Sequence, residues 1–216
     1  MSAQQVTEPT LPAAPRTRRR WSPTLVAGVV LLGLTGLVAV VSIGWTPFPV
    51  SDTSGGRLEP PSALHWLGTD TFGRDTASAV MVGTRIAFTV GVGAASIAVV
   101  LGLVLGVAAA FARGWVDDIN SSVLDLLIAF PTLLLAMLIS AAHGASLGAA
   151  IVSIGIAEAA IVARFARIVA KRLLAQPFMV AARTSGTSWP GVIVFHLLPN
   201  LWPALIVNAA LMFGMA

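Results

Sequence analysis

Two long runs of uncharged, mostly apolar residues, 24–43 and 86–112, most constrain what this chain can fold into. A helix rises about 1.5 Å per residue, so about 20 apolar residues cross the hydrocarbon layer of a bilayer, roughly 30 Å thick. Both runs reach that length. Only 10% of the 216 residues are charged, whereas soluble domains carry about 25%. The sequence therefore excludes a water-soluble globule and predicts an all-α polytopic bundle of transmembrane helices.

Polar segments between the apolar runs divide the chain into four parts. The first is rich in Pro, Thr, Ala and Arg without any period, which is typical of a disordered tail. The third is too polar to span a bilayer and contains a candidate interfacial helix with Asp75 as its N-cap. The predicted parts are a disordered cytoplasmic tail at 1–22, a first transmembrane helix at 23–44, an external loop with an interfacial helix at 45–85, and a transmembrane core at 86–216.

Four of the five expected spans lie in the core. The first of these is dense in Gly, Ala and Ser, so we expect it to pack closely against other helices. Pro131 lies inside the next span and is expected to kink it, because proline removes a backbone donor and crowds the carbonyl four residues earlier. The last run, from Leu201, measures only about 24 Å, so we expect the chain to stop inside a helix. The expected core spans are 86–112, 124–142, 145–163 and the incomplete run from 201.

Basic residues are unevenly distributed among the polar segments. Of 13 lysines and arginines, ten lie in the N-terminal tail, at 113–122 or at 164–199, and three lie in the loop 45–85. Loops rich in Lys and Arg face the cytoplasm, so the N-terminus and the segment 164–199 are predicted to be cytoplasmic. This segment lacks the interleaved aromatic residues of a nucleic-acid surface, and no nucleic-acid partner is expected. The tail arginines are instead expected to contact membrane lipid.

The sequence contains no motif for catalysis, for cofactor binding or for a metal. Its single lysine, Lys171, lies outside any phosphate-binding loop pattern. A Gly-x-Ser-x-Gly nucleophile motif is missing, the three histidines lie in separate segments, and there is no cysteine. We therefore predict that this chain is not an enzyme and has no catalytic, cofactor or metal site of its own.

Two acidic residues, Asp125 and Glu158, lie in or near predicted spans. A charge at that depth is costly unless it is paired or hydrated, so these residues mark either a transport pathway or structural ion pairs. Asp125 lies near the cytoplasmic end of its span, within reach of a loop arginine. Glu158 lies six residues before Arg164, which favours neither role over the other. Both interpretations remain open for the two acids.

The cytoplasmic segment 164–199 contains two short helix-like pieces separated by Gly186. In the first, Pro177 suits an opening turn, and apolar residues recur four positions before and after Phe178. In the second, Ser188 is a suitable N-cap. Such a bend fits a groove on a soluble partner and equally fits the surface of a lipid bilayer.

Three sequence blocks occur in order between residues 65 and 200. They are Leu67-Gly-Thr-Asp-Thr-Phe-Gly-Arg-Asp75, then Asp125-Leu-Leu-Ile-Ala-Phe-Pro131, and then Ala181-Ala-Arg-Thr-Ser-Gly186 followed by His196-Leu-Leu-Pro-Asn200. The last block resembles the Glu-Ala-Ala loop of the membrane subunits of ATP-binding cassette importers, and together the blocks are similar to the dipeptide and oligopeptide (peptide/nickel) group. The chain departs from that family at Val180, which stands where the family has its glutamate.

The resemblance implies a permease subunit in the bacterial cytoplasmic membrane that forms part of a translocation pathway for peptides. The family expects six spans. The implied partners are a second, homologous permease chain, two cytoplasmic ATPase subunits that bind ATP and Mg, and an external substrate-binding protein. A short helix of this chain is implied to dock in the ATPase, with a glycine at the following turn. The implied docking residues are Phe178, Met179, Val180, Ala181, Ala182, Arg183 and Gly186.

Other functions remain open at the level of sequence. A proton-coupled secondary transporter would use Asp125 and Glu158, although no inverted repeat is visible in the chain. A membrane anchor that does not transport would use the bend at 171–199 only to recruit a soluble protein. Within the importer class, the sequence does not distinguish peptides from nickel or another small solute.

Overall fold

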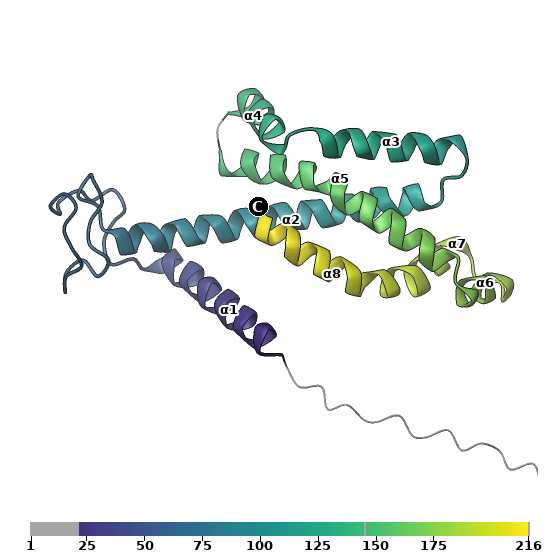
Figure 1. The fold of residues 1–216 in the computed structure, drawn as a ribbon, viewed down its shortest axis with the longest axis horizontal. Coiled ribbons are helices and arrows are strands. Elements are labelled where there is room, and N and C mark those ends of the chain that lie inside the picture. The colour runs from purple at the N-terminus through teal and green to yellow at the C-terminus, as the bar shows by residue number, and fades with distance from the viewer. Residues whose placement is uncertain (1–21, 145, 216) are drawn as a thin grey trace, which may run out of the picture.

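The computed structural model describes residues 22–144 and 146–215, and within them it is helical, with a single isolated bridge between Thr69 and Asp75 in place of strands. The tail predicted at 1–22 therefore lies, except for its last residue, outside the described residues. Figure 1 shows the elements in order. They are α1 (Pro23–Gly44), α2 (Thr76–Ala110), α3 (Trp115–Ala129), α4 (Thr132–His143), α5 (Leu147–Leu174), α6 (Pro177–Thr184), α7 (Trp189–Val192), one π-helical turn η1 (Ile193–Leu197) and α8 (Leu198–Met215).

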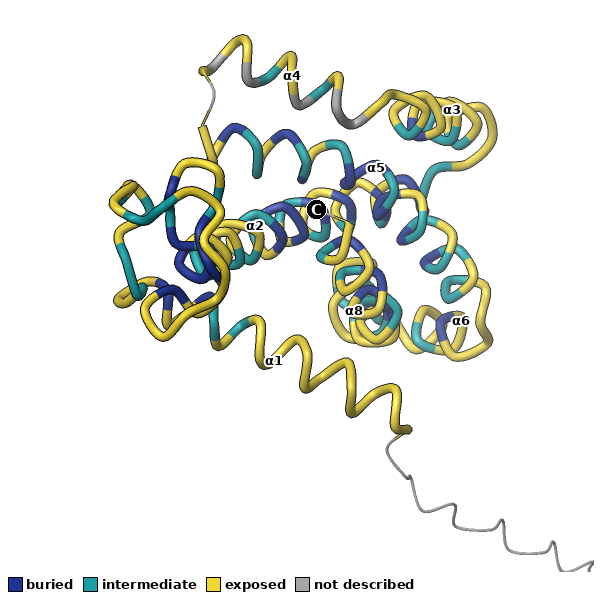
Figure 2. Tube along the Cα trace, turned by 60° about the vertical axis from the view of Figure 1, so that its left-hand side comes forward, coloured by how far each residue is buried: buried dark blue, intermediate teal, exposed yellow. Residues whose placement is uncertain are grey.

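Four helical stretches in the described part are long and apolar enough to cross a membrane. They are α1, α2, α5 and the nearly continuous helix Trp189–Met215 that ends in α8. The prediction of an all-α polytopic membrane protein is confirmed. Most of α1 is exposed along its whole length (Figure 2), which is expected of a helix whose surroundings are lipid rather than protein.

The span expected at 124–142 is divided between α3 and α4. We predicted a kink at Pro131, but the helix breaks there: Phe130 has ψ 124° and Pro131 has ψ 122°, both extended. A proline disfavours helical geometry in the residue before it, which explains why the break begins at Phe130. The single expected span is therefore two helices joined by an extended pair of residues.

Helices α2 and α5 form the centre of the bundle, and α8 packs beside them (Figure 1). Their contact is built from small residues. A Cβ atom added to Gly102 would lie 2.5 Å from the Cβ of Val162, and one added to Gly106 would lie 2.5 Å from the carbonyl oxygen of Ala163. The close packing predicted for the Gly- and Ala-rich run is confirmed, because only glycine fits at these two positions.

Two helices are longer than the sequence indicated. The interfacial helix predicted before residue 86 is the beginning of α2, which starts at Thr76. Asp75 is confirmed as its N-cap, because Asp75 Oδ2 accepts a hydrogen bond of 2.7 Å from the amide of Ser78. Helix α5 continues past the expected limit of 163 to Leu174, so four basic residues expected in a loop lie on a helix. With 28 residues α5 is about 42 Å long, which exceeds the hydrocarbon thickness.

Candidate functional site

The helices α6 and α7 and the turn between them form a bend, residues 177–192, which we call the elbow. Helix α6 ends where Gly186 adopts φ 89°, a left-handed conformation that favours glycine. The amide of Gly186 donates to the carbonyl of Arg183 at 3.1 Å, and that of Thr187 donates to the carbonyl of Ala182 at 3.1 Å. These two bonds are those of a Schellman motif, which reverses the chain after a helix. The turn expected at Gly186 is therefore present.

The residues predicted to dock lie on different faces of α6. Met179 is 2% exposed and packs into the hydrophobic core of the bundle, whereas Phe178 is 44% and Val180 56% exposed. Arg183 and Ala181 are also exposed, and Ala182 is half-buried against the core. The side chain of Met179 therefore supports α6 from inside, and a partner protein would meet Phe178 and Val180.

Trp189 connects the elbow to the end of α2. Its ring stands 5.2 Å from the ring of Phe111, the residue that follows α2, with 85° between the planes. On α6, the guanidinium carbon of Arg183 lies 4.3 Å from the centre of the Trp189 ring, and Arg183 Nη1 donates to the carbonyl of Thr187 at 2.7 Å. Sequence reasoning selected neither aromatic residue. The signal that could have pointed to this contact is Trp189 itself, a large aromatic residue directly after the predicted N-cap Ser188.

An ion cluster joins the beginning of α3 to α5. The carboxylate of Asp117 accepts hydrogen bonds from Lys171 Nζ and from Arg167, whose Nε lies 3.0 Å from Oδ1. The hydrogen bonds from Lys171 and Arg167 hold the pKa of Asp117 below its ordinary value of 3.8. This cluster was missed in the sequence because Asp117 lies 50 positions before Arg167 and 54 before Lys171.

The two membrane acids differ in their surroundings. Asp125 pairs with Arg164 at 2.9 Å, and both side chains are about half exposed. An arginine was considered as the partner of Asp125, but it was expected in a loop and lies on helix α5. Glu158 is 5% exposed, and its Oε2 has no hydrogen-bond partner among the described residues. Arg164, considered as a partner for Glu158, is instead the partner of Asp125.

The loop between α1 and α2 is fastened to the first turn of α2. His65 is buried and its Nδ1 lies 3.0 Å from Asp75 Oδ1, while Asp75 Oδ2 accepts from the hydroxyl of Ser78 at 2.7 Å. The same hydroxyl accepts a hydrogen bond of 2.9 Å from the amide of Phe48. Two residues of the loop, Phe48 and His65, are thus hydrogen-bonded to the Asp75–Ser78 pair, which fixes the loop on the helix.

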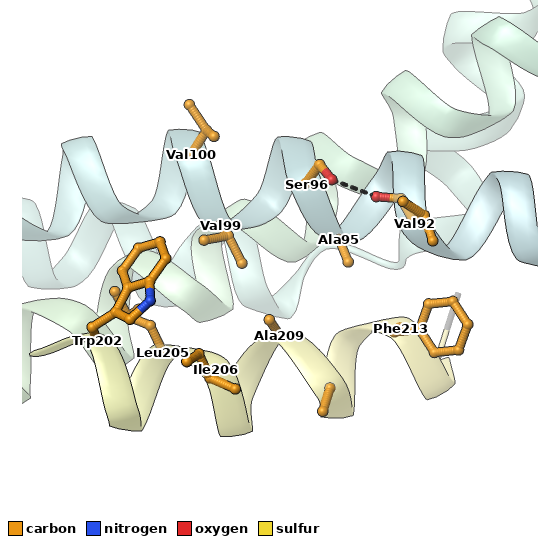
Figure 3. Close-up of a pocket in the computed structure, with 11 residues that line it drawn as sticks. Val92, Ala95, Ser96, Val99, Val100, Trp202, Leu205, Ile206, Ala209 and Phe213 are labelled. Atoms are coloured by element: carbon orange, nitrogen blue, oxygen red, sulfur yellow. Dashed lines mark hydrogen bonds between the residues drawn. The ribbon is translucent and has the colours of Figure 1, made fainter. Parts of the chain in front are cut away.

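An apolar groove of about 470 Å³ runs between α2 and α8. Figure 3 shows Trp202 at one end, Phe213 at the other and Ala95 and Ala209 between them. Its lining is mostly aliphatic and aromatic, and the hydroxyl of Ser96 donates to the carbonyl of Val92 at 2.6 Å. The groove therefore offers contacts to lipid chains or helices rather than to a charged solute. In the described residues, no group of three or more His, Asp or Glu side chains is arranged to hold a metal ion.

Comparison with known proteins decides the family. Residues 98–216, which include α5, the elbow and α8, match the family described as "binding-protein-dependent transport system inner membrane component". The chain belongs to this family. The resemblance found in the three sequence blocks is thereby confirmed, and the protein is a multi-pass membrane permease of the peptide/nickel group of ATP-binding cassette transporters.

Named relatives of this permease come from several bacteria. It is 35% identical over 192 residues to the dipeptide transport system permease protein DppC of Alkalihalophilus pseudofirmus, covering 88% of this chain and 63% of the relative. It is 34% identical to the nickel transport system permease protein NikC of Escherichia coli over 90% of this chain and 70% of the relative. The probable D,D-dipeptide permease DdpC of Escherichia coli is 36% identical, with 90% and 66% covered. The chain thus spans about two-thirds of the length of these relatives.

Proposed function

We propose that this chain is a permease subunit of an ATP-driven importer and forms part of the path by which peptides cross the cytoplasmic membrane. The observation that carries the proposal is the exposed apolar face of α6 at Phe178 and Val180, supported from beneath by the buried Met179. An exposed apolar helix face with a charged edge, here Arg183, is suited to a groove on a soluble protein. The relatives named as dipeptide permeases support peptides as the cargo.

The proposed partners follow from the family. They are two ATPase subunits, which hold ATP and Mg, a second homologous permease chain and an external binding protein that delivers the substrate. ATP-driven closure of the ATPases would move the docked elbow. The elbow contacts the end of α2 through Trp189 and Phe111, and it continues through η1 into α8. Its motion would therefore tilt spanning helices between inward- and outward-open arrangements.

The proposed orientation has the N-terminus and the elbow in the cytoplasm. Basic residues gather at the elbow end of the bundle, on α5, after α2 and on α6, with five of them between residues 164 and 183. At the opposite end, the loop 45–75 contains four acids and two arginines. This asymmetry is the one that the positive-inside rule associates with a cytoplasmic elbow.

Sidedness can be tested directly because the protein has no cysteine. Ser185→Cys in the elbow and Ser62→Cys in the loop 45–75 both replace exposed serines. In intact cells, a membrane-impermeant maleimide should label the Ser62→Cys variant and should label the Ser185→Cys variant only after the membrane is opened. Labelling of Ser185→Cys in intact cells would overturn the orientation and the docking with it.

Docking is tested by Phe178→Asp with Phe72→Asp as its matched control. Both phenylalanines are exposed, but Phe72 lies in the loop 45–75. A charge placed in the apolar groove of the ATPase should abolish co-purification of the ATPase with the Phe178→Asp variant and the uptake of a labelled dipeptide. The Phe72→Asp variant should keep the ATPase. Normal ATPase recovery with both variants would contradict the proposal.

Two other activities have observations in their favour. The similarity to NikC supports nickel as an alternative cargo of the same importer mechanism, and competition between nickel and a dipeptide for uptake separates the two. The buried Glu158 supports a proton-coupled transporter. If the chain were such a transporter, the double variant Asp125→Asn/Glu158→Gln would lose uptake, whereas depletion of ATP would leave uptake intact. The importer proposal expects the reverse.

A further inference from the structure

We propose that a cavity at the elbow end of the bundle binds the phosphate group of an anionic phospholipid. The cavity measures about 650 Å³ and lies where α2 and α5 end and α7 begins. Its walls combine two cationic side chains, Arg113 and Lys171, with three large apolar ones, Phe111, Leu174 and Trp189. Its assignment to the cytoplasmic leaflet rests on the orientation proposed above, whereas the binding itself does not.

Positive charge is in excess at this cavity. Arg113 and Lys171 line the cavity, and Arg167 lies beside Lys171 on α5. The one carboxylate that bonds to these cations is that of Asp117, which bonds to Arg167 and Lys171. Among the described residues Arg113 has no salt bridge, and it is exposed. The C-termini of α2 and α5 contribute roughly half a negative charge each, and the N-terminus of the continuous helix Trp189–Met215 contributes roughly half a positive charge, so a net charge of about +1.5 remains. Asp118, the next acid, lines a separate depression on α3.

With α5 centred in a membrane, the cavity would lie at the depth of the lipid headgroups. Helix α5 is about 42 Å long, close to the full bilayer thickness of about 40–45 Å with its headgroups. The last turn of α5, which contains Lys171 and Leu174, is therefore at the level of the phosphates when the helix is centred in the membrane. Tryptophan is enriched at that level, and Trp189 forms one wall.

A phospholipid matches both kinds of wall. A guanidinium group binds phosphate oxygens through two parallel hydrogen bonds, and an ammonium group adds a point charge. Phe111 and Leu174 would contact the glycerol and the first methylenes of the acyl chains. Free phosphate has the same charge chemistry but uses none of the apolar wall. Basic pockets between spanning helices on the cytoplasmic side are known to hold anionic headgroups.

The test is native mass spectrometry of the delipidated protein in detergent, titrated with dioleoylphosphatidylglycerol, dioleoylphosphatidylcholine or inorganic phosphate. We expect phosphatidylglycerol to be retained in preference to phosphatidylcholine, and phosphate to displace it poorly. Removal of one cation by Arg113→Gln should weaken retention about fivefold. Arg113→Lys should restore part of it. Circular dichroism and gel filtration verify that each variant is folded.

Arg172→Gln is the matched control, because Arg172 is exposed in the same turn of α5 as Lys171 but does not line the cavity. It should leave retention within about twofold of the unaltered protein. An equal loss of lipid retention in Arg113→Gln and Arg172→Gln would mean that the lipid is attracted to charge without a specific site. Equal retention of the two lipids, or ready displacement by phosphate, would mean that the cavity does not select a phospholipid. Each of these results would overturn the proposal. Loss of the lipid when the ATPase subunits assemble would instead assign the cavity to an acidic side chain of the ATPase, and would also overturn it.

Discussion

The ring of Trp189 stands edge-on to the ring of Phe111, with 5.2 Å between their centres. This is a favourable geometry for two aromatic rings, worth about 0.5–1.5 kcal/mol beyond the burial of area. Because Phe111 directly follows α2 and Trp189 begins α7, the contact joins the proposed docking element to a central helix of the bundle. Arg183 on α6 contacts the same indole ring, because its guanidinium lies over the ring of Trp189.

Trp189→Leu should uncouple the elbow without removing the docking surface. The substitution removes the aromatic contact and the cation–π contact, together worth about 1–2.5 kcal/mol, while Phe178 and Val180 stay exposed. We expect the ATPase to co-purify normally, uptake of dipeptide to fall by an order of magnitude or more, and the protein to unfold at lower temperature. Trp202→Leu, in the groove of Figure 3, is the control for loss of an exposed tryptophan, and it should retain transport. Loss of the ATPase in Trp189→Leu would contradict this division of roles.

Gly186→Ala should destabilise the elbow by about 1–2 kcal/mol, since a side chain is strained at φ 89°. Gly186→Pro should be worse, because its ring imposes a negative φ and removes the amide that donates to Arg183. Both effects are measured as increased proteolysis of the elbow in detergent. Gly214→Ala tests the opposite case: Gly214 is helical and an added Cβ meets nothing within 4 Å. That substitution should be neutral or slightly stabilising.

Gly102→Val should separate α2 from α5. The added Cβ alone would lie 2.5 Å from that of Val162, and overpacking of this kind costs about 1–3 kcal/mol or more. We expect a lower unfolding temperature in detergent and reduced recovery of folded protein. Gly33→Val in α1, where an added Cβ meets nothing within 4 Å, should leave the unfolding temperature nearly unchanged. Similar losses in both variants would mean that the α2–α5 contact is not tight.

Hydropathy predicted the four spans formed by α1, α2, α5 and α8, and local motifs predicted the Asp75 cap and the turn at Gly186, because each depends on residues close in sequence. The fifth expected span, 124–142, was wrong, since the helix breaks at Phe130 and Pro131. The extension of α5 to Leu174 escaped prediction because Arg167 and Lys171 appeared, on local evidence, to belong to a solvated loop. Both bond to Asp117, which lies 50 or more positions away. The contact between Phe111 and Trp189 escaped prediction for the same reason, because the two residues are far apart in the sequence. That Met179 is buried and Phe178 exposed depends on how α6 packs against the bundle, which local sequence does not determine.

Asp117→Asn should destabilise the protein at neutral pH and do so less at acid pH. The hydrogen bonds from Lys171 and Arg167 lower the pKa of Asp117 in the folded protein below 3.8. A lowered pKa means that the stabilisation is fully present above the unfolded value and disappears as the pH falls through the folded value. The unfolding temperatures of the Asp117→Asn variant and the unaltered protein should therefore differ at pH 7 and converge below about pH 3.8. Asp118→Asn, a change at the exposed neighbour, should leave the unfolding temperature at pH 7 nearly unchanged. A constant difference for Asp117→Asn across the pH range would mean that its charge does not hold α3 against α5.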